Sequence, residues 1–147
     1  MGFWSASRAA YLASAVLSAA GLPLSIYLIS PTDLPQFCEI GSTLSCEAVI
    51  QSEYSKFLGI PLAAFGAVWF GSALLLSIAA SAGLGVGRLL LYWSVLGVLG
   101  AVALVMVEVF LIGSICLLCT IAHAAGAGVF AAALLAHLWS QPPMTSG

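Results

Sequence analysis

Long apolar stretches alternate with short polar ones along this chain, and the few charged residues mark the boundaries between them. The uncharged stretches cover residues 9–32, 57–87, 89–107 and 109–147. Charge is the most costly feature to bury in a bilayer, and an apolar helix of about 20 residues is long enough to cross one. The pattern therefore predicts four membrane-spanning helices, over residues 8–30, 60–81, 88–112 and 114–139.

The segments between these helices are short except for one polar loop, residues 31–57, between the first and second spans. A turn of small residues joins the second and third spans, and a polar tail, residues 140–147, follows the fourth. We expect an all-α fold, a membrane four-helix bundle forming a single domain over residues 1–147, with a cysteine-containing outer loop. A cleavable signal peptide is a weaker interpretation of the first stretch, which is longer than the apolar region of such a signal.

Composition supports a membrane protein and excludes two other classes. Of all residues 63% are hydrophobic and 5% are charged, with a mean hydropathy of +1.18. An ordinary soluble domain has about a quarter of its residues charged, so lipid is the expected surroundings. The basic residues are only Arg8, Lys56 and Arg88, which lie far apart, so no nucleic-acid partner is expected.

The basic residues also indicate an orientation. Arg8 precedes the first span and Arg88 lies between the second and third, so the positive-inside rule places both in the cytoplasm, while Lys56 opposes it. Both termini are then cytoplasmic, and residues 31–57 face the outside. We expect a multi-pass protein of the cell (plasma) membrane with its cysteines facing the outside or periplasm, or alternatively one of the endoplasmic reticulum membrane.

All four cysteines fall at the outer end under this topology, where disulfides persist. Cys116 and Cys119 form a C-x-x-C at the start of the last span, a spacing that puts two sulfurs on one helix face. If Ser114 is the N-cap of that helix, the free N–H groups of the first turn favour the Cys116 thiolate. The pair is therefore predicted to be redox-active.

Cys38 and Cys46 lie in the polar, acidic outer loop, and we expect them to face water and meet a soluble protein. Two structural disulfides are an alternative, although a C-x-x-C bridge closes too small a loop to remove much chain entropy. A four-thiolate zinc site is a further alternative. Its usual ligand spacing differs from the one found here, so no metal is expected.

The order of these features resembles the bacterial and archaeal homologues of vitamin K epoxide reductase, here with a single membrane domain and no fused thioredoxin-like domain. The likeness covers essentially the whole chain: four spans, two cysteines in the first outer loop, and a C-x-x-C opening the last span. Ser52 follows Cys46 by six residues, the run 57–61 (FLGIP) leads into the second span, and 116–120 reads CLLCT.

The resemblance implies an enzyme, a disulfide-generating quinone reductase. Electrons would pass from a thioredoxin-like redox protein to Cys38 and Cys46, then through a Cys46–Cys116 mixed disulfide to Cys116 and Cys119, and on to a quinone. Menaquinone, ubiquinone or a phylloquinone-like molecule would fit. Reduction of vitamin K epoxide or quinone as the main task is an alternative.

Candidate quinone-binding residues follow from the same resemblance. They are Ser52, Leu62, Phe65 and His123. His123 lies four residues after Cys119 and seven after Cys116, so all three share a helix face, and its imidazole could donate to a quinone oxygen. The alternative is a structural histidine whose ring hydrogen-bonds to a neighbouring helix.

Glu108 is the other ionisable residue inside a predicted span, and two interpretations apply. The simpler one is that its side chain reaches headgroup water near the end of the third span; the other is a functional role. Two other classes of protein compete with the main hypothesis. One is the four-span oxidase family whose C-x-x-C lies in the first outer loop, and the other is a non-enzymatic four-span scaffold stapled by loop disulfides.

Overall fold

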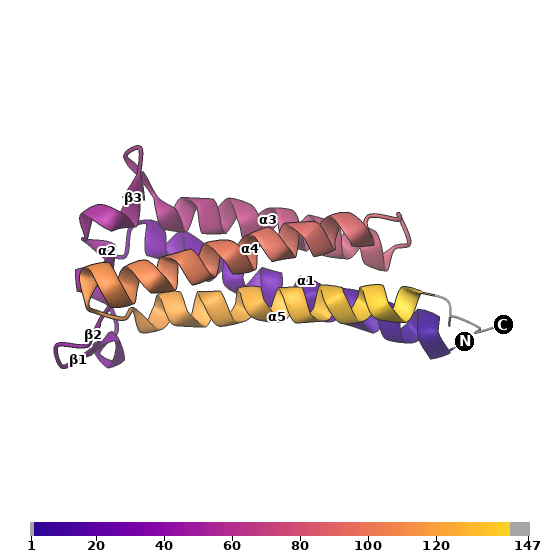
Figure 1. The fold of residues 1–147 in the computed structure, drawn as a ribbon, viewed down its shortest axis with the longest axis horizontal. Helices are drawn as coiled ribbons and strands as arrows, with labels where there is room; N and C mark the ends of the chain where they lie inside the picture. The colour runs from indigo at the N-terminus through magenta and orange to yellow at the C-terminus, as the bar shows by residue number, and fades with distance from the viewer. Residues whose placement is uncertain (1, 142–147) are drawn as a thin grey trace.

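The expected four-helix bundle is confirmed. The computed structural model describes residues 2–141, in which four long helices run side by side (Figure 1). They are α1 (Gly2–Ile29), α3 (Leu62–Ser81), α4 (Gly87–Val107) and α5 (Leu117–Ser140). All four are long and apolar enough to cross a membrane, so the chain is a multi-pass membrane protein. Residues 142–147 of the predicted polar tail lie outside the described residues.

A cap of short elements covers one end of the bundle, and α1 begins and α5 ends at the other (Figure 1). The cap consists of η1 (Gln36–Cys38), β1 (Glu39–Ile40), β2 (Leu44–Ser45), α2 (Cys46–Ile50), η2 (Glu53–Ser55), β3 (Lys56–Phe57) and β4 (Ile60–Pro61). β1 pairs with β2 and β3 pairs with β4, both antiparallel. The short hairpins thus provide hydrogen-bond partners for many backbone N–H and C=O groups of the loop, which would otherwise be unpaired at the membrane surface.

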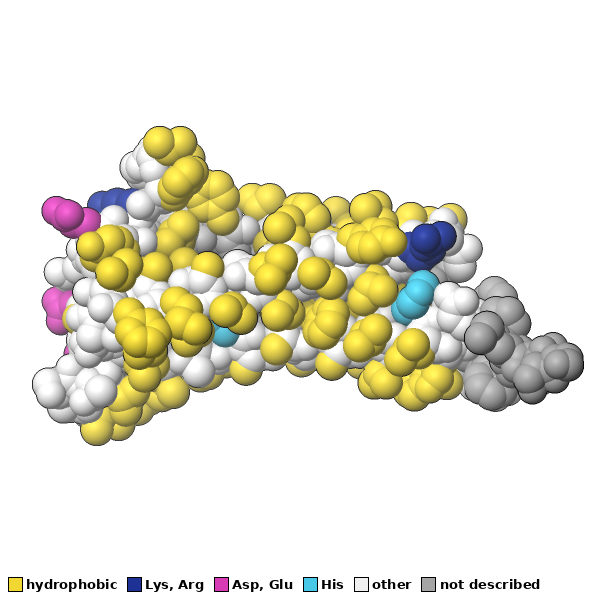
Figure 2. Space-filling model, in the orientation of Figure 1, with side chains coloured by type: hydrophobic (Ala, Val, Ile, Leu, Met, Phe, Trp, Pro, Cys, Tyr) yellow, Lys and Arg dark blue, Asp and Glu magenta, His cyan; other side chains and the backbone are white. Residues whose placement is uncertain are grey.

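The bundle surface is apolar along its flank, and its charged side chains lie toward the two ends (Figure 2). Acidic side chains gather at the capped end together with a basic one, and another basic side chain lies beside a histidine at the other end. This division matches a protein whose flank contacts lipid and whose ends contact water.

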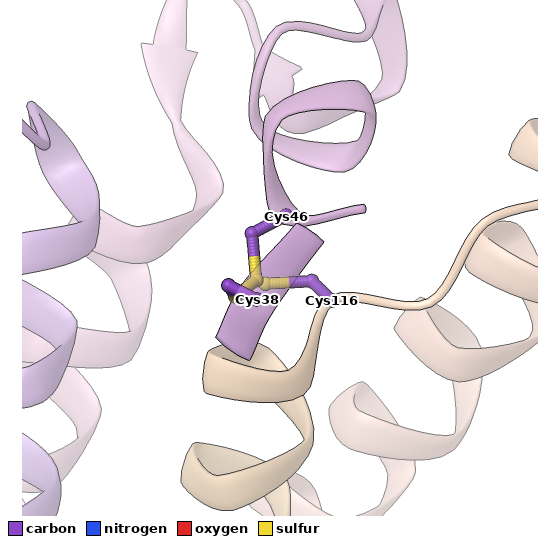
Figure 3. A group of neighbouring side chains, drawn as sticks. All are labelled: Cys38, Cys46 and Cys116. Atoms are coloured by element: carbon purple, nitrogen blue, oxygen red, sulfur yellow. A yellow bond between two sulfur atoms is a disulfide. The ribbon is translucent and has the colours of Figure 1, made fainter. Parts of the chain in front are cut away.

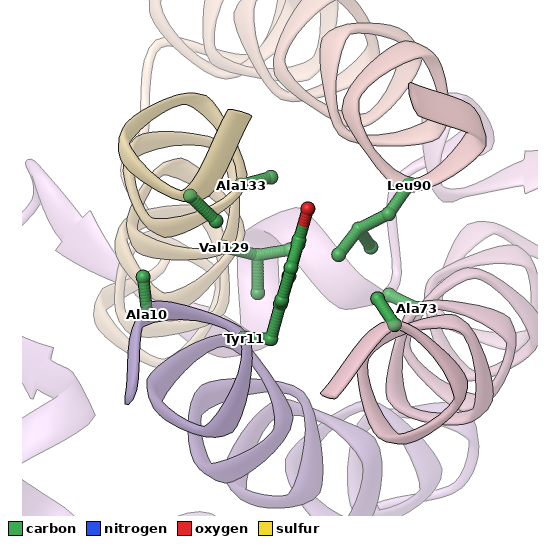
Figure 4. Close-up of a cluster of buried hydrophobic side chains, with 8 residues drawn as sticks. Ala10, Tyr11, Ala73, Leu90, Val129 and Ala133 are labelled. Atoms are coloured by element: carbon green, nitrogen blue, oxygen red, sulfur yellow. The ribbon is translucent and has the colours of Figure 1, made fainter. Parts of the chain in front are cut away.

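The helices pack through small residues around a few larger ones. Tyr11, Leu90 and Val129 fill the centre of the bundle between buried alanines of α1, α3 and α5 (Figure 4). The ring of Phe70 lies directly over Gly21, where any Cβ would overlap it. Helices in lipid associate largely by such close approach, because lipid tails are as apolar as the side chains themselves.

At the capped end α4 continues into a π-helical turn, η3 (Glu108–Ile112). Gly113 ends this turn in the left-handed region with φ +73°, and its N–H donates to the Glu108 carbonyl at 2.9 Å. Glycine adopts that conformation without a Cβ clash. The chain therefore reverses within residues 113–116 and enters α5 beside the cap.

Candidate active site

A short hairpin brings the two loop cysteines together. Glu39 of β1 lies opposite Ser45 of β2, which leaves Cys38 and Cys46 as neighbours at the open end of the ladder. Gly41 occupies the turn with φ +73°, a conformation that glycine tolerates best. Cys38 and Cys46 are joined by a disulfide in this structure.

The start of α2 is held by a carboxylate. Ser45 is its N-cap: the hydroxyl accepts from the Ala48 N–H at 3.1 Å and donates to Glu39 at 2.8 Å. The Glu47 N–H donates to the other oxygen of Glu39 at 2.9 Å. These hydrogen bonds, first that from Glu47 and then that from Ser45, lower the pKa of Glu39. The acidic loop residue thus fixes Cys46 at the first turn of α2.

A backbone bridge places Cys116 against this hairpin. Ile115 forms a parallel bridge with Leu44, in which its N–H donates to the Thr43 carbonyl at 2.9 Å. The Ser45 N–H donates in turn to the Ile115 carbonyl at 3.2 Å. The residue before Cys116 is therefore paired with β2 by a single parallel bridge, although more than 60 residues separate the two in sequence.

Three sulfurs meet as a result. The sulfur atoms of Cys38, Cys46 and Cys116 all lie within 4.8 Å of one another, and Figure 3 shows the Cys116 side chain directed at the disulfide. Thiol–disulfide exchange requires a thiolate beside a disulfide sulfur, and this arrangement supplies that contact.

The expectation that the loop pair faces water is wrong. Cys38, Cys46 and Cys116 are fully buried, at 0% exposure. They pack in an apolar cluster with Leu28 at the end of α1 and Val49 of α2. The loop is polar along its sequence, but it folds so that Leu28, Val49 and Leu118 of the neighbouring helices cover the sulfurs, while the acidic side chains stay exposed.

The cap of α5 also differs from the prediction. Cys116 itself is the N-cap: its sulfur accepts from the Cys119 N–H at 3.2 Å, and the helix begins at Leu117. The Ser114 hydroxyl instead donates to the Ser42 carbonyl at 3.3 Å and helps to hold the cap. Helix capping by the sulfur replaces the predicted serine cap.

Both cysteines of the C-x-x-C are free thiols in this structure. Hydrogen bonding from the Cys119 thiol lowers the pKa of Cys116, and the Cys119 N–H acts in the same direction, while burial opposes both. Cys116 is therefore the more readily ionised sulfur at the start of α5, as a nucleophile in exchange must be.

An apolar cavity of about 510 Å³ adjoins Cys119. Its volume lies within the range of small-molecule sites, about 300–1,000 Å³. The four predicted quinone-binding residues all border it, together with Cys119; these are Ser52, Leu62, Phe65 and His123. Sequence segments from α1, the cap, α3, α4 and α5 thus converge on one hollow.

Two of these residues shape the rim. The Ser52 hydroxyl donates to the Val49 carbonyl at 2.8 Å and so closes the end of α2. The Phe65 ring meets Phe57 of the β3–β4 hairpin edge to face, with ring centroids 6.2 Å apart. The hairpin thereby covers part of the cavity on the capped side.

His123 presents a nitrogen with unmet hydrogen-bonding capacity. Its Nδ1 atom is buried and has no hydrogen-bond partner among residues 2–141. Buried polar atoms nearly always have a partner, so such an atom beside a cavity indicates a polar group of a ligand. The alternative expectation was a histidine whose ring nitrogens bond to a neighbouring helix. Among the described residues, Nδ1 makes no such hydrogen bond.

The simpler interpretation of Glu108, that its side chain reaches headgroup water, is wrong. It is 5% exposed, and its carboxylate accepts from the Cys116 N–H at 3.2 Å. The π-helical turn directs it inward, toward the start of α5, and it also borders the cavity.

Trp69 also lines the cavity, between α3 and α4, and was not among the residues predicted from the sequence. Its indole donates to the Trp93 carbonyl at 3.0 Å, and the Trp93 indole donates back to the Trp69 carbonyl at 3.3 Å. The signal was present, since Leu62, Phe65 and Trp69 follow one another at helical spacing along one face of α3.

Fold and site together define a membrane protein in which a thiol pair lies between a loop disulfide and an apolar cavity. Residues 6–134 match the Vitamin K epoxide reductase family, and the chain belongs to that family, whose members are generally oxidoreductases. Among curated proteins, none matches the chain closely enough to count as a relative.

The family implies the use of a quinone, and the residues present fit one. The cavity is apolar, as a prenylated ring requires, and the orphaned Nδ1 of His123 is available for a ring oxygen. Trp69 and Phe65 provide aromatic faces in the same hollow.

Proposed function

We propose that this protein oxidises the dithiol of a thioredoxin-like partner and passes the electrons to a quinone, so that disulfides are made in the partner. The catalytic residues of the proposal are Cys38, Cys46, Cys116 and Cys119. The single observation that carries it is the meeting of three sulfurs within 4.8 Å at the start of a helix whose next cysteine borders the apolar cavity.

The partner dithiol reduces the Cys38–Cys46 disulfide and becomes a disulfide itself. The Cys46 thiolate attacks Cys116 of a Cys116–Cys119 disulfide, and Cys119 leaves as a thiolate. Cys38 then attacks Cys46 and releases Cys116. The result, a bonded loop pair with two free thiols at α5, is the state seen in this structure.

A bound quinone supplies an acceptor for two electrons and two protons. Cys119 and His123 both border the cavity, and the buried Nδ1 of His123 has no partner among residues 2–141, so these two residues would face the ring. Ser52, Leu62 and Phe65 would enclose it and exclude water. Menaquinone, ubiquinone and phylloquinone-like rings share the chemistry that this set recognises.

Access for the partner requires movement, because both loop sulfurs are buried in this state. We place this event outside the cytoplasm, in the periplasm or at the cell exterior, where disulfides persist. The two arginines at the opposite end of the bundle support that orientation.

The test is a thiol-trapping assay on the purified protein, with a reduced thioredoxin-like protein, a small dithiol and a soluble quinone analogue. We expect Cys116→Ala and Cys119→Ala to abolish quinone reduction with either donor. Cys38→Ala and Cys46→Ala should abolish oxidation of the protein partner but spare that of the small dithiol. Quinone reduction retained by all four variants would overturn the proposal, and a non-enzymatic scaffold would show none even in the wild type.

A further inference from the structure

One buried carboxyl beside the cysteine pair is not used by the proposed relay. Glu108 is 5% exposed, and among the described residues the one hydrogen-bond donor to its carboxylate is the Cys116 N–H at 3.2 Å. Within residues 2–141 it forms no ion pair. An apolar residue of similar size would cost less to bury there, because an ionisable group without a charged partner is expensive in a membrane.

The position of Glu108 links the thiols to the cavity. It opens the π-helical turn η3, and such turns inside helices occur often at functional sites. On one side its carboxylate touches the backbone of Cys116, and on the other it lines the cavity that Cys119 and His123 also line. Glu108 thus lies both beside the Cys116 backbone and at the edge of the cavity.

Two like charges at this place oppose each other. A negative charge on Glu108 disfavours ionisation of the Cys116 thiol, because the carboxylate lies beside the Cys116 backbone. In an apolar surrounding this repulsion is poorly screened, so the two groups share one proton more readily than they carry two negative charges.

We propose that Glu108 accepts the proton of the Cys116 thiol when the Cys116–Cys119 disulfide forms, and passes that proton into the cavity. The inference rests on the proposed function. Two S–H bonds break and one S–S bond forms; one proton leaves through Glu108 and the other leaves from Cys119 directly. Both protons and both electrons end on the quinone of the proposed function, which becomes quinol.

Other titratable groups around the cavity are less suited to this step. Tyr54 and Lys56 belong to the cap and are exposed to solvent. His123 lies on α5 one turn beyond Cys119, on the cavity side, and is placed for the ring oxygen rather than for Cys116. Of Tyr54, Lys56, His123 and Glu108, only Glu108 is hydrogen-bonded to Cys116, through the Cys116 N–H. Cys119 also bonds to Cys116, but it is the partner with which Cys116 forms the disulfide.

The first test uses activity. Glu108→Gln keeps an oxygen that accepts from the Cys116 N–H but cannot carry a proton. We expect quinone reduction to fall about 100-fold, the usual scale of general acid–base catalysis. Exchange between the loop pair and the Cys116–Cys119 pair, read by thiol trapping without quinone, should persist. Glu53→Gln, an exposed loop glutamate outside the cavity, is the matched control and should leave both unchanged.

The second test needs no quinone. In a Cys119→Ala background Cys116 is the one free thiol, and its ionisation can be followed by ultraviolet absorption of the thiolate. Glu108→Gln removes the opposing charge, so the thiolate should form at lower pH than in the background variant. An unchanged midpoint would overturn the proposal, because a purely structural role does not alter this titration.

The outcomes separate this inference from the proposed function. Wild-type protein that reduces no quinone refutes the proposed function, whereas active wild type with an equally active Glu108→Gln variant refutes only the role of Glu108. If Glu108→Gln does not fold, Glu108→Asp and Glu108→Ala decide the matter. Glu108→Asp keeps a carboxyl and should reduce quinone faster than Glu108→Ala. Equal rates of quinone reduction in the two variants would overturn the proposal.

Discussion

Ile115 lies beside Leu44 as a parallel bridge, so the residue before the C-x-x-C is tied to the residue two places before Cys46. This bridge connects the beginning of α5 to the loop hairpin through backbone hydrogen bonds rather than through side chains. It determines where the Cys116 sulfur lies relative to the loop disulfide.

Breaking the bridge should separate the two cysteine pairs. Ile115→Pro removes the N–H that donates to the Thr43 carbonyl, at a cost of about 1 kcal/mol in stability. Exchange between Cys46 and Cys116 should slow about 100-fold, because displacement of reacting atoms by about 1 Å has an effect of that size. Rapid-quench thiol trapping measures this rate. Ile115→Val keeps the N–H and should behave as wild type, and equal rates in the two variants would contradict the role of the bridge.

The C-x-x-C itself should lower the pH at which Cys116 becomes reactive. The thiol of Cys119 hydrogen-bonds to Cys116 and lowers its pKa, so the thiolate forms at a lower pH than that of an ordinary thiol. Cys119→Ala removes this donor, and the pKa of Cys116 should rise. Thiolate absorption against pH, compared with the reduced wild type, is the measurement; a midpoint that stays or falls would argue against the hydrogen bond.

Close packing of α3 and α4 should depend on one glycine. A Cβ at Gly97 would overlap the Trp69 ring, whereas a Cβ at Gly100 meets nothing within 4 Å. We expect Gly97→Ala to destabilise the protein by about 1–3 kcal/mol. Gly100→Ala on the same helix should be neutral or slightly stabilising. Thermal unfolding in detergent compares the two, and equal melting temperatures would show that Trp69 moves aside freely.

His123 should affect the quinone and not the protein partner. His123→Ala removes the unpartnered Nδ1 at the cavity, so quinone reduction should fall about 100-fold, with a higher KM for the quinone analogue. Exchange between the two cysteine pairs should be unaffected. His137→Ala, on the same helix but bonded to Gln141 beyond its end, is the control. Equal losses in quinone reduction and in exchange would indicate a structural role instead.

Much of the site could be predicted from local sequence. The C-x-x-C, the pair of loop cysteines and the residues at the cavity, such as Phe65 and His123, were all identified from spacing or family resemblance. The predicted serine cap was wrong because Ser114 and Ile115 bond to the loop hairpin, the first by its side chain and the second by its backbone, before the chain turns helical. The burial of Cys38 was missed because the polarity of a loop does not say which side of its hairpin faces inward.

The sequence by itself determined that the protein is embedded in a membrane and where its helices lie. Charge and hydropathy suffice for this, because each membrane span is recognised from its own residues alone. It also determined which residue types carry the chemistry. Only the tertiary structure decided that Cys116 meets the Cys38–Cys46 disulfide and that Glu108 turns inward to its backbone. The first contact joins segments far apart in sequence, and the second depends on a tight reversal of the chain. Their geometry is set by hairpin register, a π-helical turn and a backbone bridge, which leave no periodic pattern in the chain.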